Sequence, residues 1–127
     1  MSNLILTSQE IAQFRSQLAE YSSALQALDM IEDCEGDIED AAISMAINVG
    51  QSPTTSENWL DGLAKRHRVT ICEPTYQEDL LQSNIAPIVA HLIYQNQCPP
   101  LLVTPVVIYV LKTGIEQFCE PLKYKKI

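Results

Sequence analysis

The sequence contains few of the residues from which common catalytic and metal-binding motifs are built. Only 4 of its 127 residues are glycine, which excludes a glycine-rich phosphate-binding loop. Neither histidine, His67 or His91, has a carboxylate three residues before it, so the Glu-x-x-His pairs of di-metal helical bundles are absent. The chain has no Gly-x-Ser-x-Gly motif and no nucleophile placed with a histidine base. We therefore expect a non-catalytic protein that needs no cofactor.

The 4 cysteines are also too widely spaced to form a recognisable motif. Cys34, Cys72, Cys98 and Cys119 include no Cys-x-x-Cys pair, and zinc sites are normally built from such close pairs. The N-terminus lacks the basic n-region of a signal peptide, so we predict a cytoplasmic location. Disulfides are rare in that compartment, and we expect four reduced and mostly buried thiols.

Positive charge and long apolar runs are scarce as well. The 8 lysines and arginines face 16 acidic residues, which gives a formal net charge of −8. Such a chain is repelled by phosphate backbones and by anionic membranes, so we expect neither nucleic acid nor a membrane as partner. A basic protein would be attracted to it. The apolar run 101–111 is about half of the roughly 20 residues that a transmembrane helix needs.

Negative charge is concentrated in residues 31–40, between an amphipathic segment and the apolar run 41–47. Around Gly36 stand six carboxylates: Glu32, Asp33, Glu35, Asp37, Glu39 and Asp40. We predict that one helix ends here, that Gly36 makes a tight turn, and that the next helix begins at Asp37 with acidic residues in its first turn. A calcium loop fails, because Ile31 and Ala42 occupy positions that need oxygen ligands. The alternatives are a solvated capping region, a weak cation site and a docking surface for a basic partner.

The spacing of apolar residues predicts an all-α fold, a compact bundle of five or six helices. We expect a single helical domain over residues 1–120 and a basic C-terminal tail over 121–127. The first helix opens with a capping box at Thr7–Glu10, carries one apolar stripe from Ile11 to Leu28, and ends near Cys34. The second is apolar almost all round, so we place it at the centre together with the last helix.

Three more helices follow in the second half of the chain. A capping box at Thr54–Glu57 opens the third, which ends in the basic cluster Lys65–Arg68. The fourth opens with a further capping box at Thr75–Glu78 and is kinked or split near Pro87, because proline removes a helical hydrogen bond.

The last helix is expected to start at Thr104, with Pro105 in its first turn, and to end at Pro121. Val69–Cys72 could be helical or extended. The β-branched run Val106–Ile108 could be a strand, but no second convincing strand is available to pair with it, which favours a helix.

Residues 28–43 form a pattern of a helix, a glycine-containing turn and the motif Gly-Asp-x-Glu-x-Ala. This segment resembles the end of a ubiquitin-associated (UBA-like) domain. The methionine-glycine-aromatic loop of that family is absent, so its ubiquitin-binding surface is not carried over. The overall texture of the chain is also similar to that of small all-helical bacterial proteins.

We interpret the chain as a non-catalytic protein–protein interaction or adaptor module. Its candidate interaction surface consists of the six carboxylates named above together with Lys65, Arg66 and Arg68. The partner is expected to be a protein, and the options are a basic protein or a second copy that docks head to tail through the opposite charges. The alternative is a small-ligand-binding or regulatory domain, with a pocket between the fourth and fifth helices around His91, Tyr94 and Tyr109.

Overall fold

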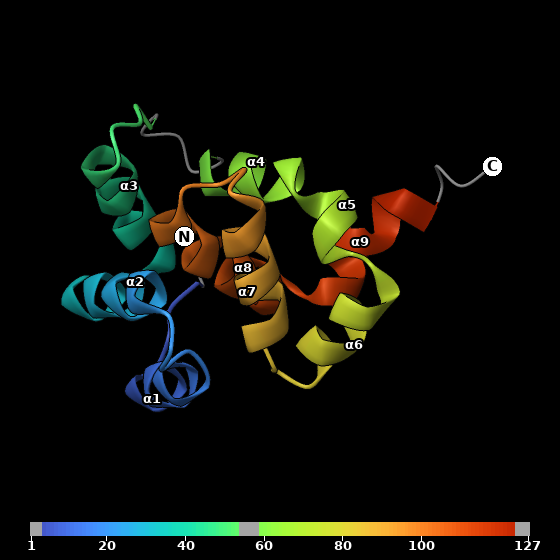
Figure 1. The fold of residues 1–127 in the computed structure, drawn as a ribbon, viewed down its shortest axis with the longest axis horizontal. Coiled ribbons are helices and arrows are strands. Elements are labelled where there is room, and N and C mark those ends of the chain that lie inside the picture. Colours follow the sequence, from blue (N-terminus) through green and yellow to red (C-terminus); the bar gives the residue numbers. More distant parts are fainter. Residues whose placement is uncertain (1–3, 54–58, 124–127) are drawn as a thin grey trace.

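Nine α-helices form within residues 4–53 and 59–123, which are the residues that this computed structural model describes (Figure 1). The prediction of an all-α fold is confirmed, and the prediction of five or six helices is wrong. The helices are α1 (Ser8–Gln17), α2 (Ser22–Asp33), α3 (Ile38–Asn48), α4 (Trp59–Arg66), α5 (Arg68–Ile71), α6 (Pro74–Leu81), α7 (Ala86–Gln95), α8 (Pro100–Thr113) and α9 (Ile115–Lys123). Five expected helices become nine because four of them are divided in two.

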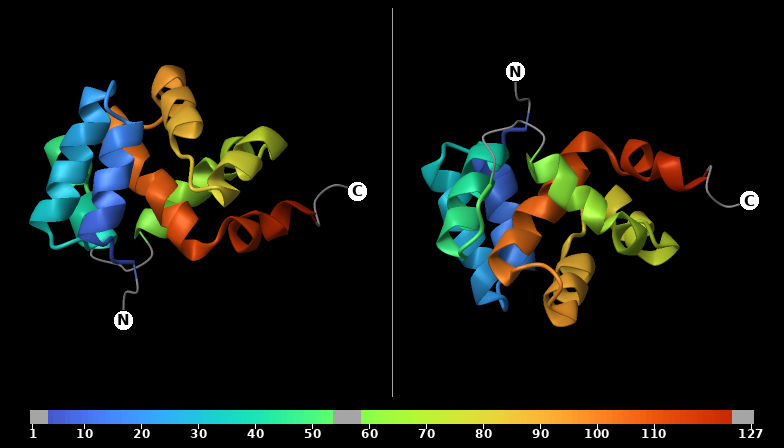
Figure 2. Two further views of the ribbon diagram at one scale, coloured as in Figure 1. Left: turned by 90° about the horizontal axis from the view of Figure 1, so that it is seen from below. Right: turned by 90° about the horizontal axis from the view of Figure 1, so that it is seen from above.

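Helix α8 is the centre of the fold. Every residue from Leu101 to Val110 is buried, and the helix contacts α2, α3, α4, α7 and α9. Figure 2 shows α8 (orange) running through the middle of the helices, with α9 (red) leaving its end. Burial of each valine, leucine or isoleucine side chain contributes roughly 1.5–3 kcal/mol, so this one helix supplies a large part of the hydrophobic stabilisation. The run Val106–Ile108 lies inside α8, so it is helical and not a strand.

Helix α3 does not share the centre with α8, contrary to the sequence prediction. Its alanine and methionine face is buried against α2 and α8. On the other side Ile47 is 65% exposed and Val49 is 38% exposed. The helix is apolar almost all round, but it lies at the edge of the bundle and only one face is covered.

The first expected helix is broken at residues 18–21, and α2 packs against α1. Arg15 shows the consequence, because its Nη2 lies 2.7 Å from Asp29 Oδ1 and 3.0 Å from Glu32 Oε1. In one continuous helix Arg15 and Asp29 would be about 21 Å apart along the axis. No glycine or proline marks the break. Leu18 is fully buried there, so tertiary packing rather than local sequence determines the turn.

The capping box at Thr7 forms as predicted. Glu10 N donates to Thr7 Oγ1 at 3.1 Å, and Thr7 N donates to Glu10 Oε1 at 3.0 Å. The capping box at Thr75–Glu78 does not form, because α6 begins one residue earlier at Pro74, whose fixed φ suits a first helical position. The capping box expected at Thr54–Glu57 lies outside the described residues.

The predicted split near Pro87 is confirmed, and the gap between α6 and α7 is closed by a side chain from α1. Pro87 is the second residue of α7, where its missing N–H costs no helical hydrogen bond. Neither Ser83 nor Asn84 caps α7. Instead Gln17 Oε1 accepts from Ile85 N at 2.9 Å, and Gln17 Nε2 donates to Ser83 O at 3.0 Å.

The last expected helix begins earlier than predicted and is bent. It starts at Pro100, so Pro105 lies inside α8, and it ends at Gly114, which has a φ of 109°. The chain then bends by 94° into α9. Pro121 lies inside α9 rather than ending it. The predicted domain boundary at 121 therefore falls within a helix, and residues 124–127 of the expected tail lie outside the described part.

Two questions that the sequence left open or excluded can be compared with the structure: the conformation of Val69–Cys72 and the presence of a membrane-spanning helix. Val69–Ile71 belong to α5, so that segment is helical. Over the described residues, no single helix is long and apolar enough to cross a membrane, although α8 and α9 together pass that test by length and composition, with the bend between them.

An ion pair fastens α1 to the end of α8. Lys112 Nζ lies 3.0 Å from Glu10 Oε1 and 2.9 Å from Glu10 Oε2. Burial by itself raises the pKa of Glu10, but hydrogen bonds from the Thr7 backbone and Lys112, with the charge of Lys112, outweigh it and lower the pKa below its ordinary value of 4.5. A depressed carboxyl pKa stabilises the fold above the unfolded value, and this stabilisation is lost as the pH falls through the folded pKa.

We predict that Glu10→Gln costs about 1 kcal/mol at neutral pH and that the difference from wild type is smaller at pH 3. Glutamine keeps the capping box, so the variant removes only the charge. Urea unfolding at both pH values measures the effect. Glu78→Gln, at an exposed carboxylate, is the control and should change stability by less than about 0.5 kcal/mol at either pH. A constant difference across the pH range would contradict the assignment.

Candidate functional site

The acidic turn, residues 32–40, joins α2 to α3 on a braced backbone. Gly36 N donates to Ile31 O at 2.8 Å, which closes the end of α2, and Asp40 N donates to Asp37 Oδ1 at 3.0 Å, which caps α3. The N-terminal segment pairs with this turn: Leu6 N donates to Gly36 O at 2.8 Å and Ile38 N donates to Leu4 O at 3.1 Å. The helix end, the tight turn and the start at Asp37 were all predicted, whereas the pairing with residues 4–6 was not.

Most of the charge on the acidic turn is uncompensated. Glu32 pairs with Arg15, and none of the other five carboxylates forms an ion pair with a described residue. Asp33, Glu35 and Asp40 are exposed, while Asp37 and Glu39 are partly buried. The pKa of Cys34 is raised by burial and then by the carboxylates of Asp40, Asp37 and Asp33. The turn is therefore a fixed patch of negative potential.

Metal ligation by this patch finds no geometric support. Across residues 4–53 and 59–123, no group of three or more His, Cys, Asp or Glu side chains is arranged to hold a metal ion.

We predict that Gly36→Ala destabilises the protein by about 3 kcal/mol. Gly36 has a φ of 87°, and an added Cβ would overlap the carbonyl oxygen of Leu6. The strain of a left-handed residue is about 1 kcal/mol, and each of the two hydrogen bonds to residues 4–6 is worth about 1 kcal/mol. Gly50→Ala is a matched control, since Gly50 has a φ of 80° and no atom within 4 Å of the new Cβ. Denaturant unfolding should show a loss of only about 1 kcal/mol for the control. Equal losses would refute the role of the N-terminal segment.

Two of the three cations in the basic cluster, Lys65 and Arg68, contact other side chains of the same molecule. Lys65 Nζ lies 2.6 Å from Asp61 Oδ2, and the Arg68 guanidinium lies 4.9 Å above the Phe118 ring. Only Arg66 is left exposed without an ion pair to any residue that the structure describes. No ion pair joins Lys65, Arg66 or Arg68 to the acidic turn, so within one described chain the two charged sets do not neutralise each other.

The three residues of the expected pocket do not converge. Tyr94 is 87% exposed. Tyr109 is buried, and its hydroxyl donates to Asp61 Oδ1 at 2.7 Å on α4. Burial and then the Asp61 carboxylate raise the pKa of Tyr109 to about 12. His91 instead faces α6, where its ring centroid lies 5.4 Å from that of Tyr76. The geometry therefore offers no common ligand site for His91, Tyr94 and Tyr109.

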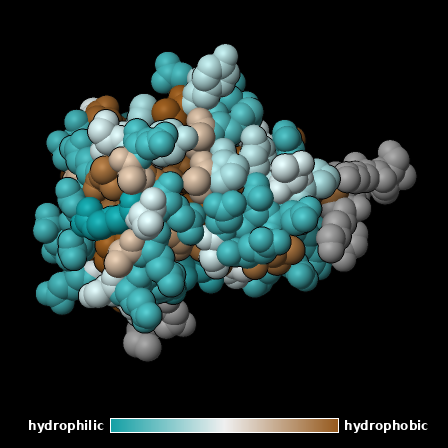
Figure 3. Space-filling model, turned by 60° about the horizontal axis from the view of Figure 1, so that its bottom comes forward, coloured by the Kyte–Doolittle hydropathy of each residue, from teal (hydrophilic) through white to brown (hydrophobic). Residues whose placement is uncertain are grey.

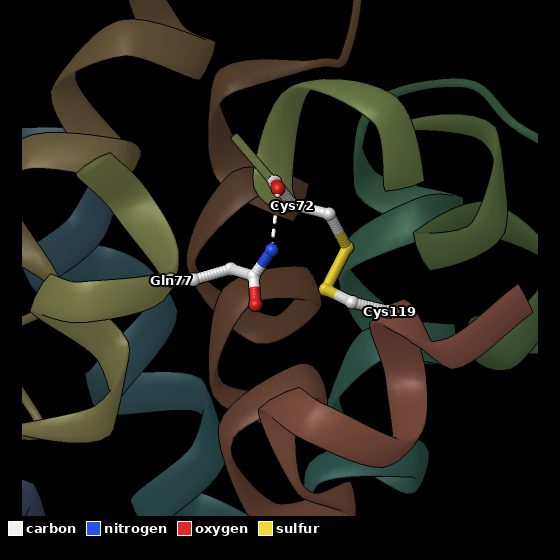
Figure 4. Close-up of a disulfide and its surroundings, with 3 residues drawn as sticks. All are labelled: Cys72, Gln77 and Cys119. Carbon is white, nitrogen blue, oxygen red and sulfur yellow. Dashed lines mark hydrogen bonds between the residues drawn. A yellow bond between two sulfur atoms is a disulfide. The ribbon is translucent and has the colours of Figure 1, made fainter. Parts of the chain in front are cut away.

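The expectation of four reduced thiols is wrong, because Cys72 and Cys119 form a disulfide (Figure 4). Cys72 caps the end of α5, and Cys119 lies on α9 with its Cα 5.7 Å away. The bend at Gly114 turns α9 back against α5 and α6, which brings together two cysteines 47 residues apart. Gln77 Nε2 donates to Cys72 O at 2.7 Å beside the bond. Cys34 and Cys98 stay thiols, and burial raises the pKa of Cys98 to about 11.

We predict that reduction of this disulfide lowers the free energy of unfolding by about 4 kcal/mol, from the loss of loop-closure entropy in the unfolded chain. The separation of 47 residues sets that value. Urea unfolding with and without a reductant measures it. The stability of the double variant Cys72→Ser/Cys119→Ser should not change when the reductant is added. The stability of Cys34→Ser should fall on reduction by as much as that of the wild type. An unchanged wild-type midpoint after reduction would contradict the prediction.

A surface hollow beside α4 was also missed by sequence reasoning. It has a volume of about 410 Å³ and is lined by Gln51, Ser52, Trp59, Gly62, Leu63 and Arg66. The sequence did contain one indication of this hollow, because Gly62 is a glycine inside an amphipathic helix. The disulfide left no comparable signal, because only the folded chain brings its two cysteines together.

Comparisons of the chain with protein-family models, with curated proteins and with solved structures find no match. The function is therefore inferred from the geometry alone.

Proposed function

We propose that this protein is a non-catalytic interaction module that binds a basic protein partner through the acidic turn. The observation that carries the proposal is the uncompensated charge on that turn. Five of its six carboxylates have no ion-pair partner among the described residues. The backbone that carries these carboxylates is held by α2, α3 and the hydrogen bonds to residues 4–6. Cations of a partner would therefore bind carboxylates on a fixed backbone.

Electrostatic attraction of this kind acts mainly on encounter and specificity. A patch of one sign steers an oppositely charged partner and rejects partners of like charge. The formal net charge of −8 extends the same field over the rest of the molecule. The lower face in the orientation of Figure 1 is mostly hydrophilic, with apolar patches between the polar side chains (Figure 3).

Self-association is a weaker form of the same proposal. Because Lys65 and Arg68 are engaged by Asp61 and Phe118, Arg66 is the only cation of the predicted cluster that a second copy could contact freely. A head-to-tail dimer would therefore rest on few charges, and a separate basic partner fits the acidic turn better.

We predict that Asp33→Lys/Glu35→Lys reduces partner binding about tenfold or more, since both side chains are exposed and uncompensated. Affinity capture from source-cell lysate with quantitative mass spectrometry identifies the partner, and titration of the purified pair gives the affinity. The matched control is Glu73→Lys/Glu78→Lys on and beside α6. Both doubles raise the formal net charge from −8 by the same four units, because each Glu or Asp to Lys change adds two.

The proposal requires a partner that the wild type and the α6 control retain and that the acidic-turn variant loses. Binding should also weaken at about 0.5 M salt, where the Debye length is only a few ångströms. Equal affinities of the two doubles for every recovered partner, or binding that salt leaves unchanged, would overturn it. Light scattering at two salt concentrations tests the head-to-tail dimer on the same samples.

A further inference from the structure

The hollow beside α4 has the size of a small-molecule site. Its volume of about 410 Å³ falls within the range of roughly 300–1,000 Å³ that such sites occupy. Four of its lining residues, Trp59, Gly62, Leu63 and Arg66, are spaced i, i+3, i+4 and i+7 and therefore share one face of α4. Gln51 and Ser52, in the segment after α3, add an amide and a hydroxyl to the lining.

Gly62 lies on the surface of this hollow. A Cβ at this position would meet no atom within 4 Å, so no neighbouring backbone requires a glycine there. Glycine in a helix interior is less favourable than alanine. Because Gly62 has no side chain, the surface of α4 between Trp59 and Arg66 is left uncovered at this position.

The lining combines an aromatic side chain, an apolar side chain and a cation that pairs with no acid among the described residues. Trp59 is partly buried and packs against the core, Leu63 is buried, and Arg66 is exposed without an ion pair to a described residue. The nearest acid on the helix, Asp61, is neutralised by Lys65 and accepts from Tyr109. A guanidinium recognises planar anions by paired hydrogen bonds, and an indole stacks on aromatic rings.

We propose that this hollow binds a small aromatic anion, with its ring over Gly62 against Trp59 and its acid group on the Arg66 guanidinium. The proposal is independent of the acidic turn, which lies between α2 and α3. Gln51 and Ser52 would donate or accept hydrogen bonds at the ligand's polar edge.

Trp59 makes the test direct, because it is the only tryptophan in the chain. A ¹⁵N-labelled full-length protein gives one indole N–H signal, which is followed by NMR during titration with 2-naphthoate. We expect a saturable shift with 2-naphthoate, and none with acetate, which lacks the ring, or with 2-naphthylmethylamine, which carries the opposite charge.

Three variants separate a built site from general attraction. Arg66→Gln should weaken 2-naphthoate binding about tenfold or more, since a charge-assisted pair is lost. Gly62→Leu should abolish it by filling the hollow, and Gly62→Ala, which also favours the helix, should weaken it without harming the fold. Lys112→Gln removes the same charge from a residue outside the hollow and should change the affinity by no more than about twofold.

The proposal is overturned if 2-naphthoate gives no saturable shift up to about 10 mM, where a ligand of millimolar affinity would be mostly bound. It is equally overturned if Gly62→Leu, shown to be folded by circular dichroism, binds as the wild type does. Equal shifts with 2-naphthylmethylamine would show that the anionic group is not recognised, and would also refute it.

Discussion

Burial of α8 is the constraint on which the rest of the structure depends. Ten consecutive residues, Leu101–Val110, can be removed from water only if other helices cover the rod on every side. Helices α2, α3, α4, α7 and α9 provide that cover. The chain has to change direction between successive helices so that each of them can contact α8. The short helices, the turn at Leu18 and the bend at Gly114 are all consequences of wrapping a chain of this length around one apolar helix.

Local sequence patterns predicted the helix breaks that neighbouring residues determine and missed the breaks that tertiary packing determines. The Thr7 capping box, the turn at Gly36 and the split before Pro87 each depend on residues close in sequence, and each was predicted correctly. The break at Leu18 carries no glycine or proline, and its cause is the packing of α2 on α1. Pro105 was expected to mark a helix start, but Pro100 already occupies the first position and the packed environment of α8 tolerates the second proline.

The same distinction holds for the candidate sites. The acidic turn is continuous in sequence, so its charge could be recognised from six nearby carboxylates. The pairing of Lys65 with Asp61 could also be recognised, because the two residues are four apart on one helix. The contact of Arg68 with Phe118 could not, because it depends on the return of α9. His91, Tyr94 and Tyr109 lie close in the expected helix pair, yet they point toward α6, solvent and α4 respectively. Side-chain direction depends on exact helix boundaries, which periodicity does not determine.

The bond between Cys72 and Cys119 closes a covalent ring that contains α6, α7 and α8. The exposed residues Gln82–Asn84 lie within this ring, at the junction of α6 and α7. A protease that cleaves there opens the backbone without releasing either fragment. The nicked protein would migrate as one band on an oxidising gel and as two on a reducing gel. The fragment that carries α8 would stay attached to the rest of the chain, covalently through the bond from Cys119 to Cys72 and non-covalently through the packing of the helices.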